Sequence, residues 1–181
     1  MNKYIKTFES YNDKLIAPNG SKSNLSKELY YMVRTTEFKD WFGDWENNPN
    51  DSSKVIDENG EPLICYHGSK IKFDIFDTDK QKNGWLGKGF YFTDNRKMTK
   101  EYGRVIFNMF LNIRNPFIVK GEAPSDVISE VKERYNSSNE YFNDDVSIIL
   151  KDNNHDGIFF KHWEQGNMFT CFNSNQIKII K

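Results

Sequence analysis

Apolar residues recur along the chain with two different periods, which indicates a mixture of helices and strands. Near the N-terminus, helical spacing places four apolar side chains on one face: Tyr4, Ile5, Phe8 and Tyr11. This spacing predicts a short amphipathic helix over residues 2–15, and the polar run at 19–23 is typical of a linker. We therefore expect an N-terminal segment at 1–23, followed by one domain over 24–181.

The rest of the pattern predicts an irregular succession of short elements. Thr35 is a typical helix N-cap, and the apolar face that follows it reaches Gly43, a residue that commonly ends helices. Asn59 and Gly60 are the turn signal of a hairpin over 54–66. Further helices are expected at 95–102, 124–135 and 143–151, and strands at 90–92, 105–113, 158–160 and 168–172. Because helices and strands do not alternate regularly, the pattern favours an α+β fold over a doubly wound parallel sheet.

Composition and charge narrow the possible functions. The 25 basic and 26 acidic residues give a net charge of −1, so general binding to duplex nucleic acid has no electrostatic support. Cys65 and Cys171 form no CxxC pair, which indicates buried free thiols rather than a disulfide scaffold or a zinc site. We expect no metal, since His155 and His162 lack ligand spacing. No apolar run is long enough to span a membrane, and no secretory signal is present, so we expect a cytoplasmic protein.

Three short motifs carry candidate chemistry. A predicted strand ends in His67-Gly68-Ser69, a glycine-rich stretch leads into the strand that holds Tyr91, and Tyr102 lies on the following helix. The glycines precede a strand rather than a helix, so they are not a dinucleotide-binding fingerprint. The two tyrosines are placed to bracket a planar ligand, or alternatively belong to the core. A thiol enzyme built on Cys65 and His67 is a weaker interpretation, because nothing nearby would activate the thiol.

Together these motifs resemble the ADP-ribosyltransferase family of the diphtheria-toxin and poly(ADP-ribose) polymerase type. They are most similar to the ADP-ribosyltransferase domains in polyvalent proteins of phages and mobile elements. The resemblance follows motifs in the same order from about Thr35 to Lys178: Glu37–Gly43, Asp57–Leu63, Tyr66–Gly68, Gly89–Thr93, Leu111–Phe117, Asp156–Ile158 and Asn175–Lys178. It implies a split β-sandwich of two small antiparallel sheets with flanking helices. It also implies a bacterial host cytoplasm as the location of a phage-encoded member.

The resemblance implies NAD as co-substrate and assigns contacts with it to six residues: His67, Gly68, Ser69, Tyr91, Thr99 and Tyr102. The histidine would hold a ribose 2′-hydroxyl, and the glycine backbone would bond the nicotinamide amide. The serine would reach the adenine-side ribose or the phosphates. The two tyrosines would enclose the nicotinamide ring, and the threonine hydroxyl would bond its amide.

The sequence departs from the family pattern at Met168, which stands where poly(ADP-ribose) polymerases carry their catalytic Glu. Methionine neither accepts a hydrogen bond from a ribose hydroxyl nor stabilises positive charge, so polymer elongation is not expected. Glu164, in the preceding loop, is the candidate replacement. Gln165 and Gln176 are weaker ones, and Gln176 is more typical of a structural residue.

These considerations predict a mono-ADP-ribosyltransferase with His67, Tyr91 and Glu164 as its catalytic residues. The acceptor would be an unidentified protein or nucleic acid, with no membrane involved. The alternative is a non-catalytic module that binds NAD, ADP-ribose or a partner protein, and Met168 is the residue that supports it.

Overall fold

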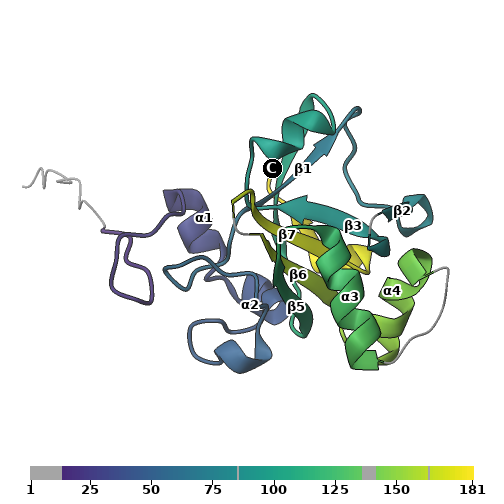
Figure 1. Ribbon diagram of the computed structural model, residues 1–181. Coiled ribbons are helices and arrows are strands. Elements are labelled where there is room, and N and C mark those ends of the chain that lie inside the picture. The colour runs from purple at the N-terminus through teal and green to yellow at the C-terminus, as the bar shows by residue number, and fades with distance from the viewer. Residues whose placement is uncertain (1–13, 85, 136–141, 163) are drawn as a thin grey trace, which may run out of the picture.

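The computed structural model describes residues 14–84, 86–135, 142–162 and 164–181 (Figure 1). The helix expected over 2–15 therefore lies almost wholly outside the described residues. The strands are β1 (Cys65–Ser69), β2 (Lys82–Gly84), β3 (Gly87–Thr93), β4 (Val105–Leu111), β5 (Pro116–Gly121), β6 (Gly157–His162), β7 (Gly166–Cys171) and β8 (Ile177–Ile179). The α-helices are α1 (Lys27–Met32), α2 (Thr36–Phe42), α3 (Pro124–Tyr135) and α4 (Phe142–Asp152). Short 3-10 turns are η1 (Pro49–Asp51), η2 (Thr78–Lys80), η3 (Met98–Glu101) and η4 (Ser174–Gln176).

The strands follow the order β5-β6-β7-β3-β1-β4-β8, with β2 paired to β3. A single residue pair, Tyr66 with Thr93, joins β1 to β3, so the sheet has two halves that separate at this point. Side chains of both halves meet in one core cluster: Cys65, Phe107, Met109 and Leu111 from β1 and β4, and Phe90, Phe92, Phe169 and Cys171 from β3 and β7. The α+β class is thus confirmed, and the two sheets that were expected are joined at this pair into one hydrogen-bonded sheet.

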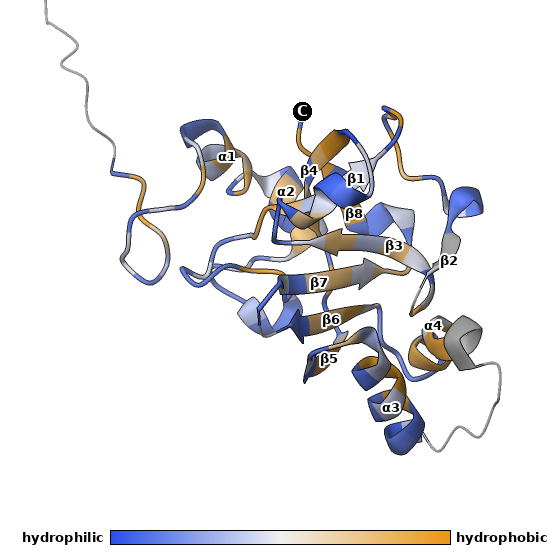
Figure 2. Ribbon diagram, turned by 45° about the horizontal axis from the view of Figure 1, so that its top comes forward, coloured by the Kyte–Doolittle hydropathy of each residue, from blue (hydrophilic) through white to orange (hydrophobic). Residues whose placement is uncertain are grey.

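One strand pair differs from the expected antiparallel arrangement. β5 and β6 are parallel, and the connection between them contains α3 and α4. A parallel pair needs a long crossover, which these two helices provide. The two helices pack against the half of the sheet that contains β5 and β6, as Figure 2 shows. Their buried aliphatic residues meet aromatic and aliphatic residues of the strands: Val127, Val131, Val146 and Leu150 against Phe117, Ile158 and Phe160.

The helices α1 and α2 form a third cluster on the other half of the sheet. The Thr35 side chain accepts a hydrogen bond from the Phe38 backbone N–H, and α2 ends at Gly43, whose φ of 100° suits glycine. Both features confirm the expected helix boundaries. Phe38 stacks on Phe42 and meets Phe110 of β4 edge to face, which fixes α2 against the sheet.

A buried carboxylate ties the segment before the domain to the hairpin turn. Glu61 is fully buried; its two oxygens bond the Arg34 guanidinium at 2.9 Å and the Ser23 hydroxyl at 2.5 Å. Asn19 adds a hydrogen bond from its amide to the Asn59 side chain. Residues 14–23 thus contact the domain in this structure, and the boundary at residue 23 stays a prediction.

Candidate functional site

His67 lies where β1 and β3 separate. Its Nδ1 lies 2.9 Å from the backbone carbonyl oxygen of Tyr91, so the ring nitrogen donates and carries a proton. Phe76 and Phe92 pack against the imidazole at centroid distances of 5.2 and 5.6 Å. This burial lowers the pKa of His67 below its ordinary value, although the bond to Tyr91 opposes the shift. The imidazole is therefore neutral near pH 7, with Nε2 as its acceptor nitrogen.

Gly68 permits η3 to lie directly on β1. A Cβ at this position would stand 2.1 Å from the Thr99 carbonyl oxygen and 3.1 Å from the Tyr102 Cβ. No side chain fits in that space, so the contact requires glycine. Gly103 makes the reciprocal approach, since a Cβ there would stand 2.0 Å from the Ser69 carbonyl oxygen. Two glycines thus bring η3, with Thr99 and Tyr102, beside the His67 backbone.

Tyr91 of β3 is covered by the glycine-rich segment that precedes it. Its hydroxyl donates to the Gly87 carbonyl at 2.5 Å and accepts from the Leu86 backbone N–H at 3.3 Å. A Cβ at Gly84 would stand 2.5 Å from the Tyr91 ring, so the segment lies flat against it. Burial is the main cause that raises the Tyr91 pKa, and the hydroxyl is protonated at neutral pH.

The other predicted NAD contacts, Thr99, Tyr102 and Ser69, occupy η3 and the end of β1. Tyr102 caps η3 and its side chain is 64% exposed, whereas Thr99 is buried and donates its hydroxyl to the Arg96 carbonyl at 2.7 Å. The Ser69 hydroxyl accepts from the Ile71 backbone N–H. The expected helix over 95–102 is in fact the shorter 3-10 turn η3.

Glu164 lies at the tip of the hairpin between β6 and β7. It is exposed, and its backbone N–H donates to the His162 Nδ1 at 3.1 Å. The Gln165 carbonyl accepts from the Asn95 side chain at 2.9 Å, which ties the tip to the residues just before η3. Met168 faces Thr93 of β3 and packs against the cluster that contains α3 and α4. The side chain at the family Glu position is thus engaged in packing.

A family model described as ADP-Ribosyltransferase in polyvalent proteins matches residues 57–181. The chain belongs to this ADP-ribosyltransferase family. No curated protein sequence matches the chain. Among solved structures, the chain is similar to the crystal structure of an anti-CRISPR protein, with a TM-score of 0.38 and 10% identity. That similarity covers 65% of this chain and 95% of the other.

Asp94 is a residue of this ADP-ribosyltransferase domain to which the sequence assigned no role. Its two carboxylate oxygens accept from the backbone N–H and the side-chain amide of Asn167, at 2.8 and 2.6 Å. Partial burial raises the Asp94 pKa, and these two bonds oppose the shift. The carboxylate fixes the end of β3 to the start of β7, next to Met168. Asp94 ends the motif that begins at Gly87, and this position was the signal in the sequence that could have indicated its role.

Two of the weaker catalytic candidates, Gln176 and Cys65, are buried and have structural roles in this member of the family. Gln176 is buried: its oxygen accepts from the backbone N–H groups of Phe172 and Asn173, just before η4, and its nitrogen donates to two backbone carbonyls. It is a structural residue, as its position suggested. Cys65 and Cys171 are free and buried, and burial raises the pKa of both thiols well above the usual value. Neither thiol is available as a nucleophile.

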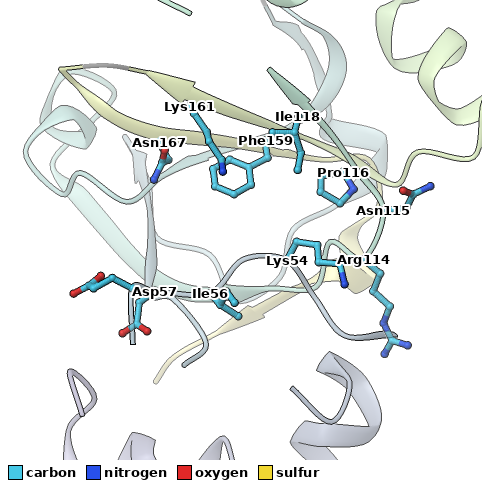
Figure 3. A pocket seen from close by; sticks show the side chains of 11 residues that line it. Lys54, Ile56, Asp57, Arg114, Asn115, Pro116, Ile118, Phe159, Lys161 and Asn167 are labelled. Atoms are coloured by element: carbon cyan, nitrogen blue, oxygen red, sulfur yellow. The ribbon is translucent and has the colours of Figure 1, made fainter. Parts of the chain in front are cut away.

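A groove of about 620 Å³ lies apart from the predicted NAD contacts (Figure 3). Segment 54–58 forms one wall, and residues of β5, β6 and β7 form the other. Phe159 and Lys161 point into it, with the Lys161 ammonium 4.8 Å from the Phe159 ring centre. Lys54, on the opposite wall, donates to two backbone carbonyls of η1. None of the residues that the family pattern assigns to NAD lines this groove, so we do not place the nucleotide there.

Groups of three or more acidic, histidine or cysteine side chains that would hold a metal ion are absent from the described residues. Likewise, no helix within the described ranges is both long enough and apolar enough to cross a membrane.

Proposed function

We propose that the chain is a mono-ADP-ribosyltransferase that uses NAD and binds its nicotinamide end between β1, β3 and η3. The observation that supports this most is that His67 bonds the Tyr91 backbone carbonyl, and that η3 lies against Gly68, where the two halves of the sheet separate. Family membership gives the transferase class. The NAD contacts, the catalytic residues and mono-transfer are the parts that this proposal adds.

The geometry gives each proposed contact a physical role. Neutral His67, fixed by its bond to Tyr91, presents Nε2 as an acceptor for a ribose hydroxyl. The exposed Tyr102 ring offers an aromatic face for nicotinamide. The Tyr91 ring, which Gly84 covers on one side and two hydroxyl bonds hold in place, is the second stacking partner that we propose. Holding NAD in one orientation brings the scissile glycosidic bond to a nucleophile, which lowers the barrier by positioning.

Charge stabilisation is the step for which this chain lacks the usual family residue. Met168 supplies none, and both oxygens of Asp94 are bonded to Asn167. Glu164, at the exposed hairpin tip, is the carboxylate that we propose to stabilise positive charge on the ribose. Removing one such group typically costs about 10²–10³-fold in rate.

A second function, NAD binding without catalysis, is favoured by the packing of Met168 in an apolar cluster. Nicotinamide release from NAD separates the two functions. The transferase proposal expects release by the wild type, loss with His67→Ala, and a reduction of about 10²-fold or more with Glu164→Gln. If Glu164→Gln matches the wild type, that residue is not catalytic. If only Met168→Glu releases nicotinamide, the natural chain is a binding module.

A further inference from the structure

The surface around η3 carries a local excess of positive charge that the net charge of the chain conceals. Six exposed cationic side chains lie in residues 70–72 and 96–104: Lys70, Lys72, Arg96, Lys97, Lys100 and Arg104. These two stretches contain a single acidic residue, Glu101. Among the ion pairs found between described residues, none includes any of the six. We call these six residues the η3 basic surface.

The two stretches form one continuous surface. A Cβ at Gly103 would stand 2.0 Å from the Ser69 carbonyl oxygen and 2.6 Å from the Lys70 backbone nitrogen, so the chain after η3 lies against the end of β1. In Figure 1, η3 is part of the teal coil that lies beside β1. The exposed ring of Tyr102, at the end of η3, adjoins the same surface. The basic surface therefore borders the proposed nicotinamide end of the site.

We propose that the η3 basic surface binds single-stranded nucleic acid as the acceptor of ADP-ribose, an inference that rests on the transferase function proposed above. Six unpaired cations exceed what the two charges of the NAD pyrophosphate require. A chain of phosphates supplies matching charge at regular spacing. In a duplex, the Watson–Crick ring nitrogens of the bases are paired and stacked, so their attack on the ribose requires an unpaired base, and attack by a terminal phosphate requires a strand end.

The transfer consumes one NAD and one acceptor group. The bond between the nicotinamide nitrogen and the ribose C1′ breaks, and its electron pair leaves with nicotinamide, which becomes neutral. A ring nitrogen of an unpaired base, or an oxygen of a terminal phosphate, donates the electron pair of the new bond to C1′. A proton on the attacking nitrogen passes to solvent, whereas an ionised phosphate oxygen has none to lose. The reaction needs no oxidant or reductant.

Binding is tested by fluorescence anisotropy with a labelled 20-nucleotide single strand, as DNA and as RNA, between 50 and 200 mM salt. If all six cations contact phosphates, the log–log dependence of affinity on salt has a slope of about −4. The double substitution Lys97→Glu with Lys100→Glu should reduce the steepness of that slope by about 1.4 and weaken binding at least tenfold. The matched control, Lys22→Glu with Lys120→Glu, changes the same charge at exposed lysines elsewhere and should leave binding unchanged. Thermal unfolding verifies that both double variants fold.

Transfer is followed with NAD labelled in its adenine ring, and nicotinamide release is measured in the same reaction. Label in the oligonucleotide, lost in the Lys97/Lys100 double variant but kept in the control, supports the proposal. Nicotinamide release without oligonucleotide binding overturns it and leaves the transferase function standing. Absence of release overturns the transferase function, and anisotropy then decides binding alone. Equal competition by poly-glutamate overturns it in favour of an acidic protein partner. Equal losses of NAD and oligonucleotide affinity in the double variant overturn it in favour of a role toward the NAD phosphates.

Discussion

Replacing Gly68 with alanine should displace η3 from β1 and disrupt the nicotinamide end of the site. The added Cβ would stand 2.1 Å from the Thr99 carbonyl oxygen, whereas ordinary contacts begin at 3.4 Å. The obstructing atom belongs to the backbone, so a side-chain rotation does not relieve the clash. The turn that holds Thr99 and Tyr102 must therefore move by about 1 Å, given the usual spacing of packed atoms.

Two quantities should change together in Gly68→Ala. Overpacking of this kind costs about 1–3 kcal/mol, which for a chain of this size lowers the midpoint of thermal unfolding by about 2–12 °C. Displacement of Tyr102 and of the Gly68 backbone should also weaken NAD binding by about tenfold or more, because a shift of about 1 Å in a site is enough for large losses. Calorimetric titration with NAD, at a temperature where the variant is folded, measures the second effect.

Two other glycines provide the comparison. Gly103→Ala should behave like Gly68→Ala, since its Cβ would strike the Ser69 carbonyl from the opposite side. Gly157→Ala, on β6, would stand 2.6 Å from the Thr170 carbonyl oxygen and should cost stability without a specific loss of NAD affinity. Wild-type NAD affinity in Gly68→Ala would refute the proposed site. An equal loss in Gly157→Ala would show that affinity follows stability alone.

Three further outcomes are expected. Tyr102→Ala should weaken NAD binding by about tenfold, because a stacking partner contributes about 1–3 kcal/mol, whereas Tyr102→Phe should keep it; unchanged calorimetric affinity in the alanine variant would exclude the stacking role. Burial lowers the pKa of His67 in the folded chain, so the unfolded chain binds the proton more readily. The free energy of unfolding should therefore fall as the pH drops below about 6.5. Denaturant titration at several pH values should show a shallower fall in His67→Leu. Arg34→Met leaves the carboxylate of Glu61 buried without its ion-pair partner and should cost about 3–5 kcal/mol, measured by denaturant unfolding; a loss below 1 kcal/mol would contradict the burial described.

Local signals in the sequence predicted the local elements well. Thr35 and Gly43 predicted the two ends of α2 correctly, because helix capping depends on residues within one turn. The helices over 124–135 and 143–151 agree closely with α3 and α4, since their apolar spacing covers several turns. The expected helix at 95–102 was too long, because the close contacts of Gly68 with Thr99 and of Gly103 with Ser69 hold the short 3-10 turn η3 against β1.

Contacts between distant segments lay beyond the reach of these signals. The parallel pairing of β5 with β6 depends on how α3 and α4 cross the sheet, and strand periodicity contains no information on direction. The Asp94–Asn167 contact joins residues that are far apart in sequence, and a carboxylate next to a strand is usually a turn residue. The six predicted NAD contacts came from family resemblance, and the structure adds the physical reason that Gly68 must be glycine.

The net charge of the chain likewise says nothing about how its charged side chains are distributed over the surface. The total of −1 argues against a basic field over the whole molecule, yet charges farther apart than about 8–10 Å are largely screened from one another at physiological salt. Acidic residues such as Glu130 and Glu133 belong to α3, and this helix packs on β5, at the far end of the strand order from β1. They therefore do little to cancel the field of Lys97 and Lys100 beside β1. A strand of nucleic acid that contacts only the η3 basic surface experiences the local charge, and for that reason a nearly neutral chain remains compatible with a polyanionic acceptor.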